Sequence, residues 1–244
     1  MDVTAVLFDL DGTLLPMDQE KFTRGYLGML CGKLAPRGYR PEEVVDGIWA
    51  GVGAMVANQG QTSNEDAFWR EFYRRFGEDA RADRPLVDEF YAREFRDAAQ
   101  FCGHNPQAAQ AVRAMKADGA TVALATNPIF PAAATRVRIG WTGLAPEEFA
   151  LYTTYENCHW CKPSLGYYRE VLDALGLRPE QCLMVGNDVR EDMVAQELGM
   201  KVFLLTDCLI NRDGADIDAW PHGGFPELLA YWGQLRGQGA PGDK

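Results

Sequence analysis

Short apolar runs alternate along this chain with longer segments that have helical periodicity. The first run, Ala5–Phe8, has the length of one buried strand. Four later segments also have strand-like patterns: 121–125, 150–154, 182–185 and 201–205. Helical patterns cover 107–118, 131–139, 164–175, 191–198 and 226–235. Strands that alternate with helices predict an α/β fold built on a doubly wound parallel sheet.

The stretch from residue 17 to about residue 101 contains no strand-like run. Helical patterns there cover 17–34, 41–56, 65–76 and 85–97. Ser63 or Asn64 is expected to cap the third of these helices. The many aromatic residues of this stretch have helical spacing, which indicates packing between helices rather than a cofactor site. We therefore predict an α/β core of residues 1–16 and 102–236, an all-helical insertion of residues 17–101, and a flexible tail of residues 237–244.

Composition narrows the class of protein. The chain has 244 residues, of which 47% are hydrophobic and 24% charged, as in soluble globular proteins. A formal net charge of −11 disfavours nucleic acid and anionic membrane surfaces as partners, but not a small phosphorylated molecule. Neither a signal peptide nor a membrane-spanning run is expected, and six scattered cysteines suit reduced thiols in a cytoplasmic protein. No feature indicates an oligomeric state.

Two carboxylates, Asp9 and Asp11, follow the first apolar run directly. Residues two apart on an extended chain point to the same side, so both can face one pocket. At close range they repel each other by about 4 kcal/mol at an effective dielectric constant of about 20, which favours a cation between them. An ordinary exposed turn would be the simpler interpretation of Asp and Gly at a strand end, if this stretch stood alone.

Further polar residues lie where later strands should end. Thr126 and Asn127 follow the second predicted core strand, and Asp188 follows the run 182–185, with Asp192 four residues later. Lys162 lies in a Lys-Pro turn before a predicted helix. Ligands of open parallel sheets bind beyond the carboxyl ends of the strands, so we expect these groups near Asp9 and Asp11.

The five residues DLDGT, from Asp9 to Thr13, resemble the nucleophile motif of the haloacid dehalogenase-like (HAD) hydrolase superfamily. The order of acid pair, Thr-Asn, lysine and second acid pair also resembles the four motifs of that family, over about 200 residues. The resemblance implies a Rossmann-like core with a helical cap of the C1 type inserted after the first motif. It further implies an Mg²⁺-dependent phosphatase that acts on a small phosphorylated metabolite.

The same resemblance implies a role for each motif residue. Asp9 would be the nucleophile that forms an aspartyl-phosphate, and Asp11 the general acid and base. Thr126 and Asn127 would bind the transferring phosphoryl group. Lys162 would hold the negative charges of this group and of Asp9 together.

A magnesium ion is implied between the first and the last motif. Its ligands would be the Asp9 carboxylate, the Asp11 backbone carbonyl, Asp188 and Asp192. Many relatives have an acid directly after the glycine of the last motif, where this chain has Asn187. The departure leaves open whether Asp188 or Asp192 contacts the metal directly, and Asp192 could instead act through water or support Lys162.

Cys158-His159-Trp160-Cys161 is a competing constellation. A zinc site would need further ligands, and Cys102 with His104 is the nearest other pair in sequence. The preferred interpretation is that these residues shape the loop carrying Lys162, with Trp160 lining the cleft.

Three other functions compete with a phosphatase. A phosphomutase of the same superfamily keeps both acids of the first motif, and a catalytically silent scaffold could bind or regulate a partner. A receiver domain of signalling proteins also uses Asp, Thr and Lys but is about half this length. Dehalogenases lack the second acid, so Asp11 argues against that chemistry. Substrate choice should depend on the cap, with Phe22, Arg24, Tyr26 and residues 51–60 as candidates.

Overall fold

The computed structural model describes residues 3–237, so most of the predicted tail, 238–244, lies outside the described residues. Five strands form one sheet in the order β2-β1-β3-β4-β5, and every neighbouring pair is parallel. The strands are β1 (Ala5–Phe8), β2 (Thr121–Leu124), β3 (Cys182–Gly186), β4 (Lys201–Leu205) and β5 (His222–Gly223). The predicted α/β class with a parallel sheet is therefore confirmed.

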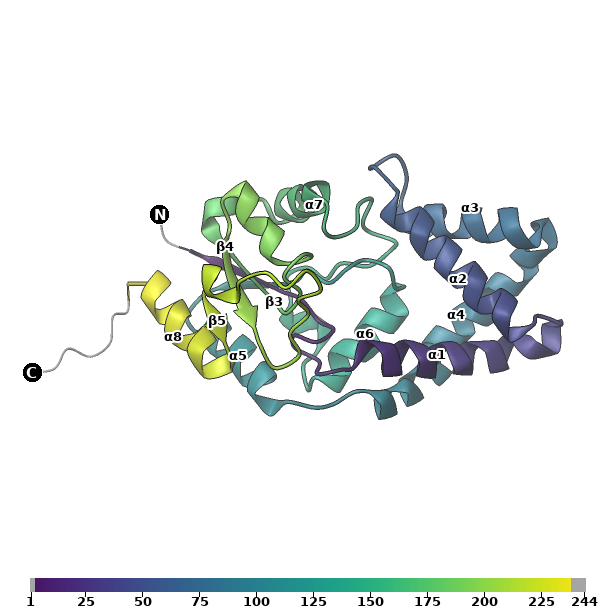
Figure 1. The fold of residues 1–244 in the computed structure, drawn as a ribbon, viewed down its shortest axis with the longest axis horizontal. Helices are drawn as coiled ribbons and strands as arrows, with labels where there is room; N and C mark the ends of the chain where they lie inside the picture. Colours follow the sequence, from purple (N-terminus) through teal and green to yellow (C-terminus); the bar gives the residue numbers. More distant parts are fainter. Residues whose placement is uncertain (1–2, 238–244) are drawn as a thin grey trace, which may run out of the picture.

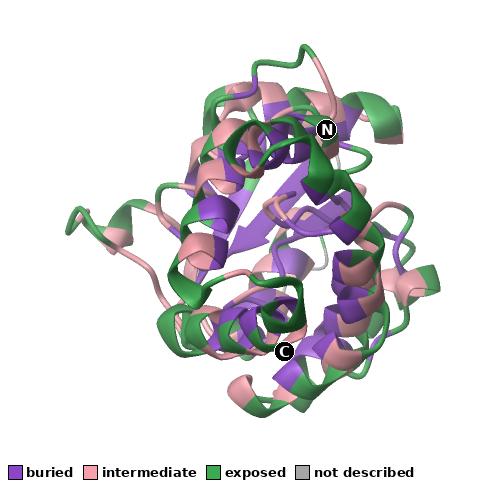
Figure 2. Cartoon of the chain, turned by 90° about the vertical axis from the view of Figure 1, so that its right-hand side faces the viewer, coloured by how far each residue is buried: buried purple, intermediate pink, exposed green. Residues whose placement is uncertain are grey.

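Helices cover both faces of the sheet (Figure 1). Alternate residues of β1 explain why: Val6 and Phe8 belong to one apolar cluster, and Ala5 and Leu7 to a second cluster on the other face. Such strands are buried on both sides, as Figure 2 shows in purple. The core helices are α5 (Pro106–Ala117), α6 (Ala132–Trp141), α7 (Leu165–Leu175) and α8 (Phe225–Leu235).

The segment between β1 and α5 is helical throughout and lies to one side of the sheet (Figure 1). Its α-helices are α1 (Gln19–Leu34), α2 (Pro41–Val56), α3 (Asn64–Phe76) and α4 (Arg84–Ala92). Two links that lead into and out of it run side by side, because Met17 forms an antiparallel bridge with Cys102. We call the segment 17–101 the cap. It shares one continuous apolar cluster with the core.

Local sequence signals account for many helix ends. Asp18 caps α1 by accepting a hydrogen bond from the Lys21 N–H at 2.9 Å, and Ser63 caps α3 in the same way through the Asp66 N–H at 3.1 Å. Short 3₁₀ helices complete the chain at Ala35–Arg37, Glu78–Asp83, Glu94–Phe101, Pro146–Glu148, Pro179–Gln181, Met193–Leu198 and Ile217–Ala219.

Four sequence predictions need correction. The expected strand 150–154 forms only an isolated bridge, between Leu124 and Tyr152, although backbone hydrogen bonds from the Ala150 N–H to the Val122 carbonyl and from the Thr153 N–H to the Leu124 carbonyl keep it beside β2. The expected helix 191–198 is a 3₁₀ helix, and the expected helix 85–97 ends at Ala92 before a second 3₁₀ segment. The two-residue strand β5 has no apolar run and was not predicted. Within residues 3–237, no helix is both long and apolar enough to cross a bilayer.

Helix α2 packs closely on α3 at Gly47 and Gly51, and the contact at Gly51 can be tested. A Cβ at Gly51 would lie 2.4 Å from the Phe68 ring, whereas a Cβ at Gly53 would meet nothing within 4 Å. We expect Gly51→Ala to lower the free energy of unfolding by about 1–3 kcal/mol, because α2 and α3 must separate. Gly53→Ala should raise it by up to about 1 kcal/mol. Urea denaturation measures both, and equal effects would contradict this packing.

Candidate active site

The carboxyl edge of the sheet holds the groups that the sequence placed together. In the strand order 2-1-3-4-5, β2 lies on one side of β1 and the later strands lie on the other side. The strand order therefore reverses at β1, and the ends of β1 and β3 flank the crevice where ligands bind. Asp9 directly follows β1, Asp188 lies two residues beyond β3, and Thr126 two residues beyond β2. All three line a cavity of about 330 Å³ between the core and the cap. The ends of β1, β2 and β3 therefore carry these residues to one cavity, as the sequence predicts.

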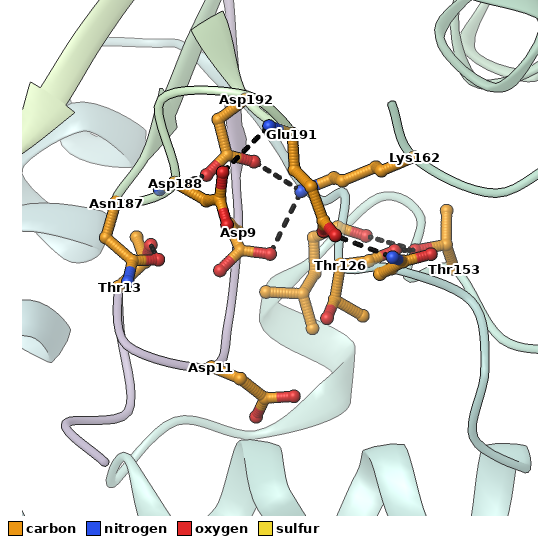
Figure 3. A network of polar contacts seen from close by, with 12 residues as sticks. Asp9, Asp11, Thr13, Thr126, Thr153, Lys162, Asn187, Asp188, Glu191 and Asp192 are labelled. Carbon is orange, nitrogen blue, oxygen red and sulfur yellow. Dashed lines mark hydrogen bonds and ion pairs between the residues drawn. The ribbon is translucent and has the colours of Figure 1, made fainter. Parts of the chain in front are cut away.

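Lys162 is the centre of the polar network (Figure 3). Its side chain is fully buried, and its Nζ donates to Asp9 Oδ1 at 2.9 Å and to Asp192 Oδ1 at 2.6 Å. Burial alone would lower the pKa of Lys162, but the Asp192 and Asp9 carboxylates raise it well above its ordinary value. The lysine is therefore a permanent positive charge next to Asp9.

Asp192 supports this lysine from the opposite side. Its second oxygen, Oδ2, accepts a hydrogen bond from the Asp188 N–H at 2.9 Å, so both of its oxygens have partners. The approach requires Gly186, where a Cβ would lie 2.1 Å from the Asp192 carboxylate. Of the roles that the sequence left open for Asp192, this geometry favours support of Lys162.

Asp188 organises the turn after β3. Its Oδ1 accepts hydrogen bonds from the N–H groups of Arg190 and Glu191 at 2.8 and 3.0 Å. Its Oδ2 lies 3.4 Å from the Arg212 guanidinium, and both residues line the cavity. Asp188 is thus anchored through Oδ1, which leaves Oδ2 as the oxygen that suits a direct metal ligand.

Asp11 lines the same cavity but lies apart from the lysine network (Figure 3). It forms an ion pair with Arg138 of α6, whose side chain is completely buried with its guanidinium 4.1 Å from the centre of the Phe130 ring. Burial raises the pKa of Asp11, and Arg138 opposes that rise. The other carboxylate oxygen, Oδ1, is buried without a hydrogen-bond partner in the described chain. Asp11 therefore has one oxygen, Oδ2, that is ion-paired with Arg138 and one, Oδ1, that has no hydrogen-bond partner.

Thr126 and Asn127 line the same cavity. The Thr126 carbonyl accepts hydrogen bonds from Thr153 Oγ1 at 2.6 Å and from the Tyr167 hydroxyl at 2.9 Å, which fix this loop. Asn127 donates from Nδ2 to Glu191 Oε2 at 3.1 Å. The residues predicted to bind phosphate are therefore held firmly at the cavity edge.

Four residues of this site escaped the sequence analysis. Glu191 is the first residue of the predicted helix 191–198, a position where an acid is ordinary, yet burial raises its pKa to about 7. Arg138 had no distinguishing signal, because a lone arginine in a helical pattern reads as a surface residue. Thr13 belongs to the DLDGT motif and donates from Oγ1 to Asn187 Oδ1 at 3.0 Å, so the motif itself could have pointed to it. Asn64 was interpreted only as a possible helix cap.

Asn64 joins the cap to the loop that carries Lys162. This fully buried side chain donates to the carbonyls of Pro128 and Trp160 at 3.3 and 3.2 Å and to Cys161 Sγ at 3.4 Å. Its backbone N–H also donates to the Cys158 carbonyl at 2.8 Å. The start of α3 thus packs on the loop 158–161 through these hydrogen bonds. The contacts hold the segment that leads to Lys162, which is the role predicted for this loop.

One prediction for this loop and one for the cap are wrong, those that placed Trp160 and Arg24 at the cavity. Trp160 does not line the cavity but packs against the glycines at 60 and 166. Burial raises the pKa of the Cys161 thiol to about 12, and that of the Cys158 thiol further. Among the cap candidates, Phe22 and Tyr26 line the cavity, while Arg24 is exposed at the surface near Glu20.

The donor set has the chemistry that magnesium prefers. Mg²⁺ binds through one or two carboxylates together with waters and substrate phosphates. The Asp9 and Asp188 carboxylates line the cavity and supply such oxygens. Throughout residues 3–237 no cluster of three or more Asp, Glu, His or Cys side chains is arranged to hold a metal by itself. The site therefore fits an ion completed by waters and phosphate rather than a closed protein cage.

Removing the lysine charge tests the central network. Lys162→Met should leave the buried carboxylates of Asp9 and Asp192 without a cation, at a loss of about 3–5 kcal/mol in the free energy of unfolding. Urea denaturation in metal-free buffer measures this loss. Lys33 also donates to two carboxylates, but at the cap surface, so Lys33→Met should cost much less. Similar losses in both variants would contradict a desolvated network.

Glu191 predicts a pH dependence of stability. Its pKa is raised from 4.5 to about 7 in the folded chain, so folding favours the neutral form. That stabilisation is complete below pH 4.5 and is lost as the pH rises through 7, by about 3 kcal/mol at 1.36 kcal/mol per unit. Urea midpoints of the metal-free protein between pH 5 and pH 8 should therefore fall less in Glu191→Gln than in the unmodified chain. The exposed control Glu197→Gln should keep the full slope, and an unchanged slope in Glu191→Gln would contradict the assignment.

Comparisons with known proteins give the fold and the family of this chain. No curated protein matches the sequence. Among solved structures, a HAD phosphatase from Thermococcus onnurineus is 21% identical with a TM-score of 0.57, over 96% of this chain and 99% of that chain. The fold is shared by CbbY from Rhodobacter sphaeroides in complex with phosphate, which is 19% identical with a TM-score of 0.55, over 93% of this chain and 96% of that chain. It is also shared by the putative HAD-hydrolase YfnB from Bacillus subtilis bound to magnesium, which is 16% identical with a TM-score of 0.55, over 95% of this chain and 99% of that chain. A family profile of haloacid dehalogenase-like hydrolases matches residues 3–199, and the chain belongs to that family.

Proposed function

We propose that this hydrolase is an Mg²⁺-dependent phosphatase that cleaves a small phosphomonoester through an aspartyl-phosphate on Asp9. The observation that carries the proposal is the contact between Lys162 Nζ and Asp9 Oδ1, 2.9 Å long: Asp9 lines the cavity next to the β1 end, and Lys162 is buried beside it without itself lining the cavity. A carboxylate needs a nearby fixed cation to accept a dianionic phosphoryl group, because two anions otherwise repel each other.

In the first step the free Asp9 oxygen attacks phosphorus and the ester oxygen leaves as an alkoxide. Lys162 offsets the charge of the Asp9 carboxylate as the phosphoryl group approaches, and Thr126 donates its hydroxyl to a phosphoryl oxygen. Asp11 gives its proton to the departing alkoxide, which leaves as the alcohol. The raised pKa of Asp11, caused by burial, favours the protonated form that this step needs.

In the second step water hydrolyses the acyl phosphate. Asp11, now ionised, takes a proton from the attacking water, and Asp9 is released as a carboxylate together with inorganic phosphate. The ion pair with Arg138 orients Asp11 and stabilises its ionised form between the two steps. Arg138 therefore acts through Asp11 and does not itself line the cavity.

Magnesium would be held by the Asp9 and Asp188 carboxylates and by the Asp11 backbone carbonyl. When bound, it would neutralise charge on the phosphoryl oxygens. The support for this assignment is the oxygen-only donor set and the arrangement of Asp188, whose Oδ1 is held by the turn while Oδ2 has only the Arg212 ion pair at 3.4 Å. Asp192 would act by holding Lys162, which donates one hydrogen bond to Asp192 and one to Asp9.

We also propose a cytoplasmic protein with a small phosphorylated metabolite as its partner and with neither nucleic acid nor membrane as a ligand. The six cysteines are free thiols, which suits a reducing compartment. The net charge of −11 opposes binding to polyanions.

Turnover of a generic aryl phosphate with Mg²⁺ tests the function directly. Asp9→Asn should lower kcat by about 10⁴-fold or more and abolish the phosphorylated intermediate, which mass spectrometry of the quenched protein detects. Asp11→Asn should lower kcat by about 10²–10⁴-fold. The exposed control Asp173→Asn should keep full activity.

Three other outcomes would redirect the proposal. If no phosphoester is turned over at any Mg²⁺ concentration, the chain is a silent scaffold. If a phosphorylated isomer forms without release of inorganic phosphate, the chain is a phosphomutase. If Asp9→Asn keeps its activity, the nucleophile is assigned wrongly.

A further inference from the structure

The cap side of the cavity carries no charged side chain among the residues that line it. All four cap helices contribute to this wall, and most of its members are aliphatic or aromatic. Phe22 from α1, Ile48 and Val52 from α2, Phe68 from α3 and Tyr91 from α4 represent the four helices. The group attached to the phosphoryl oxygen must lie against this wall, since the core side holds the phosphate-binding residues.

Helix α2 presents an apolar row to the cavity mouth. Trp49, Val52 and Val56 all line the cavity, at spacings of three and four residues that place them on one helix face. Trp49 is 52% exposed and Val56 is 54% exposed, and in residues 3–237 these are the large apolar side chains left exposed. Exposed apolar surface at a pocket mouth is a feature of binding sites, because a ligand can cover it.

The cations near the cavity are already engaged. Lys162 is held by Asp9 and Asp192, and Arg138 is held by Asp11 without lining the cavity. Arg212 does line it, but it belongs to the core and not to the cap wall, and it lies 3.4 Å from Asp188. A second anionic group that lies against the cap wall would therefore meet apolar side chains and no cation.

A leaving group rich in hydroxyls would also fit poorly. Its hydroxyls would lose water and face Phe, Val, Ile and Trp side chains, which offer few hydrogen-bond partners. The cap residues at the cavity that carry a hydroxyl or amide group are few: Gln19 and Thr23 on the first two turns of α1, and Tyr26 and Tyr91. The volume of about 330 Å³ is at the small end of the range for ligand sites, so the leaving group is compact.

We propose that the substrate is a phosphomonoester of a small apolar alcohol or phenol, with no second charged group. The inference rests on the proposed phosphatase function and adds the chemical class of the leaving group. The phosphoryl group would bind at Asp9, Thr126 and Lys162, and the alkyl or aryl group would cover the row formed by Trp49, Val52 and Val56.

The test compares esters whose leaving groups are all primary alkoxides. We expect kcat/KM for hexyl phosphate to exceed that for glucose 6-phosphate and for phosphoglycolate by about 10-fold or more, on the scale of discrimination by apolar pockets. A series from ethyl to hexyl phosphate should show a rise with chain length. Equal values, or a preference for either polar ester, would overturn the proposal.

Two variants of neighbouring residues locate the preference. Val56→Arg places a cation on the apolar row and should lower kcat/KM for hexyl phosphate about 10-fold while raising that for phosphoglycolate. Ala57→Arg adds the same charge one residue later, at an exposed position that does not line the cavity, and should change neither value. If both variants behave alike, the row does not contact the leaving group.

A third variant separates the two proposals. Trp49→Ala should raise KM for hexyl phosphate, while inhibition by inorganic phosphate stays unchanged because the phosphoryl site is intact. Failure of every ester, generic aryl phosphates included, would count against the phosphatase function itself. Turnover with a preference for charged or polyol esters would count against the substrate class alone.

Discussion

The buried charge of Lys162 is the constraint on which the rest of the site depends. A desolvated ammonium group is tolerated only where carboxylates surround it, and here Asp9 and Asp192 do so at 2.9 and 2.6 Å. Those two contacts bring together the end of β1, the turn after β3 and the loop before α7. Gly186 is required for the same reason, because any side chain there would occupy the space of Asp192.

The cavity is divided into a charged floor and an apolar roof. The floor gathers acids around one lysine, and Arg138 holds Asp11 at the boundary through a buried ion pair beside the Phe130 ring. The roof comes from the cap, whose helices share one apolar cluster with the core. Asn64 links the two parts, since it hydrogen-bonds to the loop that leads to Lys162. Cap position and lysine position are thus coupled by direct contacts.

Local sequence patterns predicted the elements that are stabilised locally. Alternation of strands and helices indicated the parallel sheet, and side-chain caps such as Ser63 marked helix starts within one residue. Predictions failed where tertiary contacts decide the outcome. The segment 150–154 lies along the edge of β2 through a few backbone hydrogen bonds but forms no regular strand, and β5 is too short to have a pattern. The short 3₁₀ helix Met193–Leu198 follows a turn that Asp188 and Asp192 build for Lys162.

The sequence by itself determined the fold class and the group of residues around Asp9, because apolar periodicity and motif order both survive in one dimension. It placed the acids and the Thr-Asn pair at strand ends, which the sheet brings to one edge, and the lysine in a turn before a helix. Only the tertiary structure decided how they are paired: Asp192 on Lys162, Arg138 on Asp11, and Glu191 on Asn127. The same holds for the apolar roof, since which face of a cap helix borders the cavity depends on how four helices pack above the sheet.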